Sequence, residues 1–240
     1  MPTNHRTTGC AIDLAMRHTA VLFWADDGFE WEVFSTNGPR GKESRESFET
    51  TYHAQECAEE LYDWLRDTVL ARMDLALVAV ELATHAQSSG ALCAMMLARG
   101  AFAAIAPSLR RRQVAVDYVV QQESRAAVLA VRPKSVRIRK DATEEEQLAA
   151  RRQREENRAE IKRAVKLHVL FHFPELASVE ASVGHLAEHV YDAASVLIAT
   201  APRPSAGLLG DERRARLLDA SVPTARQRAV PPLFAHSVGE

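Results

Sequence analysis

The chain has 240 residues, of which 47% are hydrophobic and 26% charged, so it has enough apolar residues for a sizeable core and global disorder is excluded. With 30 basic and 32 acidic residues, the formal net charge of −2 does not indicate a uniformly basic nucleic-acid binder. No uninterrupted apolar run reaches the roughly 18 residues that a membrane span needs. The three cysteines, Cys10, Cys57 and Cys93, are too widely spaced for a disulfide framework or a zinc site. We therefore expect a cytoplasmic protein that does not enter a membrane.

The first part of the chain is predicted to form three strands, at residues 8–14, 19–25 and 29–35. An Asp-Asp-Gly turn separates the last two, which favours an antiparallel meander. After a polar loop, apolar residues recur at helical spacing over residues 47–72, and this pattern predicts a long amphipathic helix.

An almost wholly apolar strand is predicted next, at residues 75–81, and such a run is typical of a strand covered on both faces. A helix over residues 86–99 is expected to end at Gly100. A further apolar strand over residues 101–106 is expected to stop at Pro107. This alternation of strands and helices favours parallel pairing.

The rest of the chain is predicted to be mainly helical. Residues 114–120 and 126–131 have patterns that suit either a strand or a helix. Long helices are predicted over residues 142–172, whose first half is highly charged, and over residues 183–201.

Together these elements predict an α/β protein with a mixed five-stranded sheet, in which an antiparallel meander is followed by parallel strands and helices flank both. Residues 1–202 are expected to form this domain, and residues 203–240, which contain several prolines and arginines, a peripheral C-terminal tail. Basic residues gather locally despite the small net charge, and separated acidic and basic faces allow a protein to bind a polyanion. The basic segments are residues 110–112, 132–140 and 151–166.

Three acidic residues stand in apolar surroundings. Asp13 ends the apolar run Gly-Cys-Ala-Ile, Glu81 ends the strand over residues 75–81, and Asp192 lies in an otherwise apolar stretch of the last long helix. An ionised carboxylate in such a setting is costly without a partner, and hard divalent cations prefer oxygen ligands. If the first strand pairs with residues 75–81, Asp13 and Glu81 lie side by side at the ends of neighbouring strands.

His189 precedes Asp192 by three residues and therefore lies on the same face of the helix. With Asp13 and Glu81 these two residues would surround one point, and such a set is suited to two Mg²⁺ or Mn²⁺ ions about 4 Å apart. Lys162 is the best-placed cation to stabilise charge that builds up on a phosphate. The sequence therefore predicts a metal-dependent enzyme, most plausibly one that cuts a phosphodiester.

The motifs resemble those of the RuvC family of Holliday-junction resolvases, which have an RNase H-like fold. The resemblance rests on Gly-Cys-Ala-Ile-Asp13, on Val-Ala-Val-Glu81 and on His189-Val-Tyr-Asp192-Ala-Ala, and Ala-Glu-Ile-Lys162-Arg-Ala-Val is similar to the family's lysine-bearing segment. It implies a crossover-junction endodeoxyribonuclease in which Asp13, Glu81, His189 and Asp192 bind two Mg²⁺ or Mn²⁺ ions and Lys162 assists. It further implies a homodimer that acts on branched DNA, with the three basic segments on phosphates.

Three alternatives are left open. A different RNase H-like nuclease or a transposase-type enzyme would use the same fold and carboxylates. A catalytically silent nucleic-acid-binding module would keep the fold alone. An actin-like ATPase also places an Asp at the end of its first strand, but residues 14–16, Leu-Ala-Met, do not supply the Gly- and Thr-containing phosphate loop that follows it there.

Overall fold

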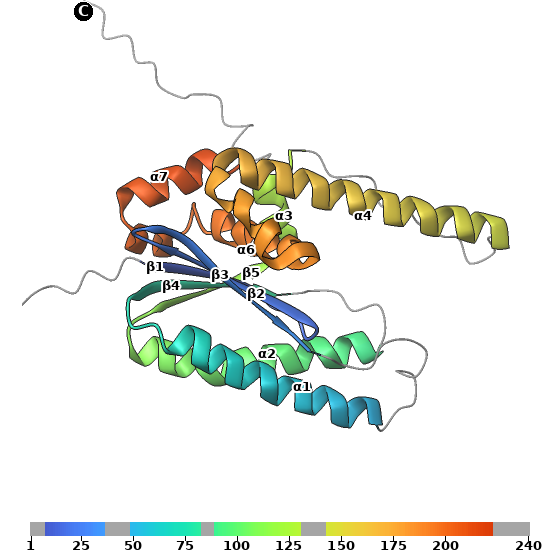
Figure 1. The fold of residues 1–240 in the computed structure, drawn as a ribbon, viewed down its shortest axis with the longest axis horizontal. Helices are drawn as coiled ribbons and strands as arrows, with labels where there is room; N and C mark the ends of the chain where they lie inside the picture. The colour runs from blue at the N-terminus through green and yellow to red at the C-terminus, as the bar shows by residue number, and fades with distance from the viewer. Residues whose placement is uncertain (1–7, 37–48, 83–88, 131–142, 223–240) are drawn as a thin grey trace, which may run out of the picture.

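Five strands form one mixed sheet in the computed structural model (Figure 1), which describes residues 8–36, 49–82, 89–130 and 143–222. The sheet order is β3-β2-β1-β4-β5. β1, β2 and β3 are antiparallel neighbours, whereas β1, β4 and β5 pair in parallel. This arrangement confirms the predicted mixed sheet and is that of an RNase H-like fold. The strands are β1 (Thr8–Asp13), β2 (His18–Ala25), β3 (Gly28–Ser35), β4 (Leu75–Leu82) and β5 (Ala115–Val120).

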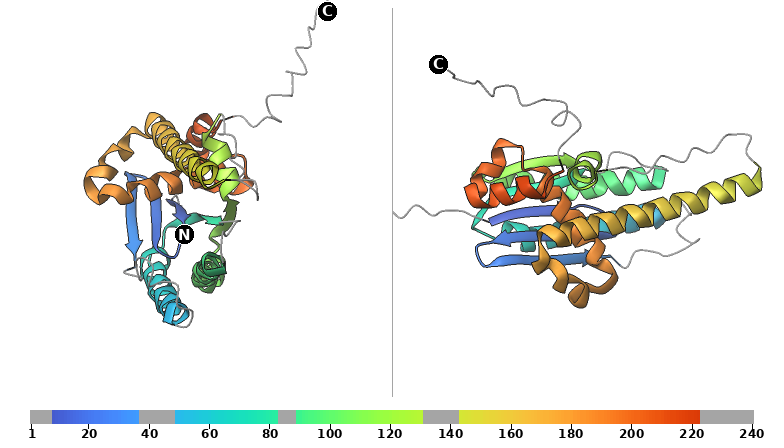
Figure 2. Two further views of the ribbon diagram at one scale, coloured as in Figure 1. Left: turned by 90° about the vertical axis from the view of Figure 1, so that its right-hand side faces the viewer. Right: turned by 90° about the horizontal axis from the view of Figure 1, so that it is seen from above.

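Helices cover both faces of the sheet, as Figures 1 and 2 show. One face carries α1 (Glu49–Leu65), which continues as a π-helical turn at Arg66–Leu70, and α2 (Ser89–Arg111). The other carries α6 (Ala187–Ala199), the C-terminal half of α4 (Glu144–His172), and the short helices. These are α3 (Gln121–Val128), α5 (Val179–Val183), α7 (Asp211–Ala220) and the 3₁₀ turns Pro174–Ser178, Gly184–Leu186 and Pro204–Leu209.

The pleat of the central strands divides the core into two clusters. Cys10 and Ile12 of β1 are buried in the cluster with α1 and α2, whereas Ala11 between them is buried in the cluster with α6. Successive residues of a strand point to opposite faces, so the residue after Ile12 is directed toward α6. β4 follows the same rule, with Val80 toward α2 and Ala79 toward α6. The near-continuous apolar run of β4 is thus explained by burial on both faces.

The expected strand at residues 101–106 is wrong, because α2 runs through it as a single helix. Phe102, Ile105 and Leu109 are buried against the sheet at helical spacing. Pro107 lies on the exposed side of the helix, where the carbonyl that loses its hydrogen-bond donor is next to solvent. In the described part of the chain, residues 91–111 of α2 are the one helical segment long and apolar enough to cross a membrane. A helix in the core of a soluble protein can be equally long and apolar.

The fifth strand lies instead at β5, so the ambiguous residues 114–120 are mostly strand and residues 126–128 belong to α3. The predicted helix over residues 142–172 is confirmed as α4, and Thr143 caps its N-terminus together with Glu146. The last long helix is shorter than expected, because Gly184, with φ of +59°, interrupts the region before α6.

The described chain beyond residue 202 packs on the sheet, whereas a peripheral tail was expected from residue 203. Leu209, Leu217 and Ala220 are buried in the same cluster as α6. Gly9 of β1 leaves room for Leu209, since a Cβ at this position would lie 3.0 Å from a Leu209 methyl group. The folded unit therefore continues to at least Val222, whose N–H donates to the carbonyl of Ala127. Residues 223–240 of the expected tail lie outside the described residues.

Two neighbouring leucines of α7 test whether this segment is part of the core. Leu217 is fully buried, whereas 46% of Leu218 is exposed. Leu217→Ala should lower the free energy of unfolding by about 2–5 kcal/mol, because it leaves a cavity, and Leu218→Ala should change it by less than about 1 kcal/mol. Urea unfolding of both variants measures the difference. Equal effects of the two substitutions would show that α7 does not belong to the cooperative unit.

Candidate active site

Two acidic residues end the parallel pair of strands at the centre of the sheet. Ile12 of β1 lies opposite Val80 of β4, and the next residues along the two strands are Asp13 and Glu81. The sequence predicted that Asp13 and Glu81 would be neighbours if the first strand paired with residues 75–81, and this pairing is present. Because the residues alternate between faces, both carboxylates lie on the side of the sheet that α6 covers.

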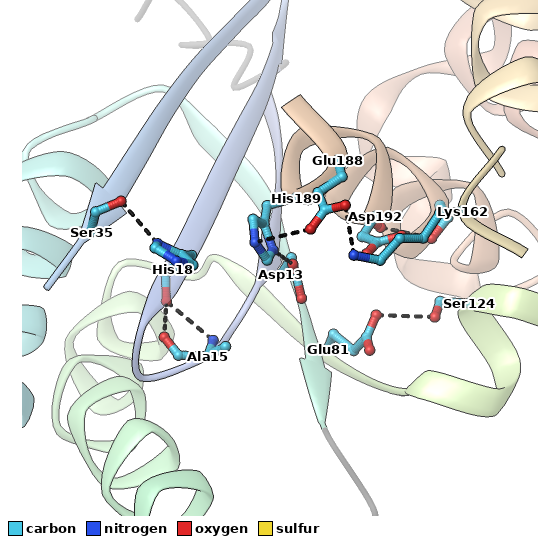
Figure 3. A network of polar contacts seen from close by, with 12 residues as sticks. Asp13, Ala15, His18, Ser35, Glu81, Ser124, Lys162, Glu188, His189 and Asp192 are labelled. Carbon is cyan, nitrogen blue, oxygen red and sulfur yellow. Dashed lines mark hydrogen bonds and ion pairs between the residues drawn. The ribbon is translucent and has the colours of Figure 1, made fainter. Parts of the chain in front are cut away.

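Helix α6 brings the other predicted side chains to the same place (Figure 3). His189 Nδ1 donates a hydrogen bond to Asp13 Oδ2 at 2.8 Å, across 176 residues of chain. Asp192 lies one turn further along the helix, and its charge interacts with those of Asp13 and His189. The structure thus brings Asp13, Glu81, His189 and Asp192 close enough for their charges to interact.

Burial and like charges strongly affect Glu81, of which only 6% is exposed. Burial and, to a smaller extent, the charges of Asp13 and Asp192 raise its pKa to about 8. The hydroxyl of Ser124 on α3 opposes this rise by donating a hydrogen bond to Glu81 Oε2 at 3.1 Å, and the charge of Arg125 opposes it further. Near neutral pH, Glu81 therefore holds a proton unless a cation replaces it.

Asp192 shows the same effect. Burial raises its pKa to about 7, with a further contribution from the charge of Asp13, while Arg125, His189 and Lys162 lower it. The ionised forms of these three carboxyl groups repel one another in a partly buried position, so a bound cation would stabilise them in place of protons.

His189 is more basic than an ordinary histidine. Burial lowers the pKa of its imidazole, but the hydrogen bond to Asp13 and the charges of Asp13, Glu188 and Asp192 together raise it above the usual value. Its ring lies next to that of His18 of β2, with 5.4 Å between the ring centroids. The imidazolium form therefore compensates part of the negative charge of the carboxylates.

Lys162 reaches the rim of the site from α4. Its Nζ lies 2.6 Å from Glu188 Oε2, and Glu188 Oε1 lies 3.8 Å from His189 Nε2, so Glu188 connects the lysine with the imidazole. Lys162 is partly exposed, and its charge lowers the pKa of Asp192. A cavity of about 380 Å³ opens beside it between α4 and α6, and Tyr191 and Asp192 also line this cavity.

The donor set fits hard divalent cations, because Asp13, Glu81 and Asp192 offer only carboxylate oxygens. As they stand, however, no three His, Cys, Asp or Glu side chains of the described residues are grouped closely enough to hold a metal ion. Asp13 is engaged with His189 and Glu81 with Ser124. These two carboxylates would therefore have to exchange at least one protein partner for a cation.

Three contributors to the site were not predicted from the sequence. Ser124 and Arg125 lie on α3, in a region whose secondary structure the sequence left undecided. Glu188 directly precedes His189 and could have been noticed as part of the motif. Asp117 and Glu123, further acidic residues of the same region, are engaged elsewhere: Asp117 accepts a hydrogen bond from Ser205, and Glu123 forms an ion pair with Arg203 at 3.1 Å.

The sheet order and the carboxylates at the ends of β1 and β4 define an α/β protein with an RNase H-like fold and an acidic centre. No family model and no curated protein matches the sequence. Some solved structures, however, are similar to this one. The chain is similar to Thermus thermophilus RuvC, at 15% identity and a TM-score of 0.42 over 82% of this chain and 97% of that one.

It is also similar to the yeast mitochondrial Holliday junction resolvase Ydc2, at 12% identity and a TM-score of 0.46 over 87% of this chain and 79% of that one. A third structure, T. thermophilus RuvC in complex with a Holliday junction substrate, matches at 17% identity and a TM-score of 0.37 over 50% and 68% of the two chains.

The raised pKa of Glu81 predicts how pH affects stability when no metal is present. Folding raises the pKa of Glu81 from its usual 4.5 to about 8. The protonated side chain therefore contributes its full stability to the fold below about pH 4.5, and this contribution is lost as pH rises through about 8. Glu81→Gln keeps the shape without the charge. At pH 9 its free energy of unfolding should exceed that of the wild type by on the order of a few kcal/mol, and at pH 4.5 the two should be similar.

Urea unfolding in EDTA across this pH range measures the effect. Glu60→Gln on the exposed side of α1 is the control and should follow the wild type at every pH. Parallel pH profiles for the wild type and Glu81→Gln would show that Glu81 does not carry the predicted repulsion.

Proposed function

We propose that the protein is a metal-dependent endonuclease that hydrolyses phosphodiester bonds in branched DNA, with the four-way junction as its substrate. The observation that carries this proposal is the meeting of Asp13, Glu81 and Asp192, with His189, at the ends of the central parallel strands (Figure 3). Carboxylates in this position repel one another, and a pair of divalent cations is the partner that turns the repulsion into binding.

Asp13, Glu81 and Asp192, with His189 as a further ligand, would hold two Mg²⁺ or Mn²⁺ ions. When bound, such ions activate a water molecule toward phosphorus and neutralise the leaving oxygen. Ser124 and Arg125 position and partly neutralise Glu81 before the cations arrive. With Asp13 on a cation, His189 would lose this hydrogen-bond partner, and its imidazole would orient the attacking water or hold a borderline metal such as Mn²⁺.

Lys162 contributes from the rim of the site. Its ammonium group, which now pairs with Glu188 at 2.6 Å, would turn toward the phosphate and stabilise the charge that builds up on it. Because Glu188 also lies near His189, the ion pair keeps the lysine within reach of the carboxylates. Lys162 is thus assigned an electrostatic role.

The choice of a branched substrate rests on the resemblance of the motifs to the RuvC family. A four-way junction has two-fold symmetry, so the protein would act as a homodimer whose two sites cut symmetric strands. A related RNase H-like nuclease would cut linear or flapped DNA instead, and a silent binding module would cut none.

Cleavage of a synthetic four-way junction in Mg²⁺ or Mn²⁺ tests the proposal. The wild type should cut symmetrically, and Asp13→Asn, Glu81→Gln and Asp192→Asn should each lower the rate about 100-fold or more, since each removes a charge on which transition-state stabilisation depends. Asp117→Asn is the matched control and should retain activity. Binding of the junction with no cleavage in either metal would contradict the proposed function, and cleavage of linear duplex alone would contradict the substrate.

Metal binding is also measurable without catalysis. Mn²⁺ at about 100 times its dissociation constant should stabilise the folded wild type by about 2.7 kcal/mol, which a thermal melt detects. Asp192→Asn should lose most of this stabilisation, whereas Asp117→Asn should keep it. A wild type whose melting temperature does not respond to Mn²⁺ or Mg²⁺ would count against a metal centre.

A further inference from the structure

Helix α4 is far longer than its contacts with the domain require. It has 29 residues, and its buried side chains, Val165 and Val169, lie in its C-terminal half. The N-terminal half extends beyond the sheet and the other helices, on the side of the molecule where α2 begins (Figures 1 and 2). From residue 151 to residue 160 every side chain except Asn157 is exposed. This overhang is held as a helix by the Thr143 cap and the three acidic residues of its first turn.

Three arginines of the overhang share one helix face. Val169 and Val165 mark the face that packs on the domain. Steps of three or four residues from Val165 toward the N-terminus lead along the same face to Lys162, Arg158 and Arg154, and then to Arg151. Where a helix that packs on a core would continue with apolar residues, this one has arginines, with Ile161 as the exception.

The opposite face carries charges of both signs, because Arg152 and Arg163 lie there beside acidic residues. Glu145, Glu156 and Glu160 lie there, turned by more than about 100° from the arginines, since each residue advances the helix by about 100°. After the first turn, residues 151–166 hold seven basic residues and three acidic ones. The face that borders the candidate active site is therefore the positive one, and the face directed away from it is mixed.

The row also has a defined end point. Lys162 closes it at the rim of the carboxylate site, where its charge lowers the pKa of Asp192. The cavity of about 380 Å³ beside Lys162 is lined by two further basic residues, Arg163 and Lys166, and by acidic residues that include Glu180 and Glu188. An anionic chain lying on the row would thus run directly to the place where the carboxylates meet.

We propose that Arg151, Arg154 and Arg158, called here the arginine row, bind the phosphate backbone of the duplex arm that leaves the cleavage site. This inference rests on the proposed function and adds the surface that receives the arm. From Arg151 to Lys162 the helix rises by about 16 Å, which corresponds to about five phosphates of one strand along a duplex. Guanidinium groups suit this task, because they donate two parallel hydrogen bonds to one phosphate.

A matched pair of substitutions separates the arginine row from net charge. Arg151→Gln and Arg152→Gln remove the same charge from adjacent exposed positions, but only Arg151 lies on the row. Binding of a synthetic four-way junction is measured in EDTA, without cleavage, as a function of salt. Arg151→Gln should reduce the slope of log affinity against log salt by about 0.9, whereas Arg152→Gln should leave it unchanged.

The triple substitution of Arg151, Arg154 and Arg158 to Gln should lower affinity on the order of 10-fold or more and reduce the slope by about three times the single effect. The same three positions changed to Lys should restore most of the slope, since the charge is retained. Circular dichroism should show unchanged helix content in all variants. If Arg151→Gln and Arg152→Gln gave equal slopes, the arginine row would not bind the phosphates of the arm, and the proposal would be overturned.

The length of the duplex arm gives a second test, which distinguishes contact with this arm from a general electrostatic effect. Shortening one duplex arm of the junction from about ten to about three base pairs removes the phosphates that the row would contact. Wild-type affinity should fall to that of the triple variant, and the triple variant should be insensitive to the change. A triple variant as sensitive as the wild type would contradict the assignment.

These outcomes stay distinct from those for the proposed function. A reduced slope in the row variants without any cleavage in Mg²⁺ or Mn²⁺ would support the arginine row and contradict the nuclease. Cleavage by the wild type together with equal slopes would support the nuclease and contradict the row.

Discussion

Mutual repulsion of three carboxylates is the constraint around which this molecule is arranged. Asp13 and Glu81 are fixed side by side by the parallel pairing of β1 and β4, and Asp192 is brought to them by α6. Burial and like charge raise the pKa of Glu81 to about 8 and that of Asp192 to about 7, so Glu81 favours protonation near neutral pH and Asp192 titrates close to it. A protein that places acids in this way gives up stability unless cations bind there, and such costs are typical of functional sites.

The surrounding residues moderate this repulsion. His189 donates to Asp13, Ser124 donates to Glu81, and Arg125 and Lys162 contribute positive charge. They come from three helices of the α6-side layer, namely α3, α4 and α6, so this layer both covers the core and organises the site. The α1 and α2 layer on the other face contributes burial but none of these side chains. The geometry of the candidate site therefore depends chiefly on how α3, α4 and α6 pack across the carboxyl ends of the strands.

The sequence was most informative where a local pattern had one structural meaning. The alternating strands and the Asp-Asp-Gly turn predicted the meander, and the two acidic strand ends predicted that Asp13 and Glu81 lie side by side. Residues 101–106 were wrongly predicted as a strand, because a short apolar run in a buried helix resembles a buried strand. Gly100 and Pro107, which were expected to end elements, lie at positions where α2 tolerates them. Ser124 and Arg125 could not be assigned, since their contacts with Glu81 and Asp192 depend on tertiary packing.

The central claim is that the carboxylates at the ends of β1 and β4 are completed by metal ions. Anomalous diffraction from crystals grown with Mn²⁺ measures this directly. The account predicts manganese peaks between Asp13, Glu81 and Asp192, with Asp13 turned away from His189 toward the metal. An ordered site in crystals saturated with Mn²⁺ that shows no anomalous peak, and in which Asp13 keeps its hydrogen bond to His189, would contradict it.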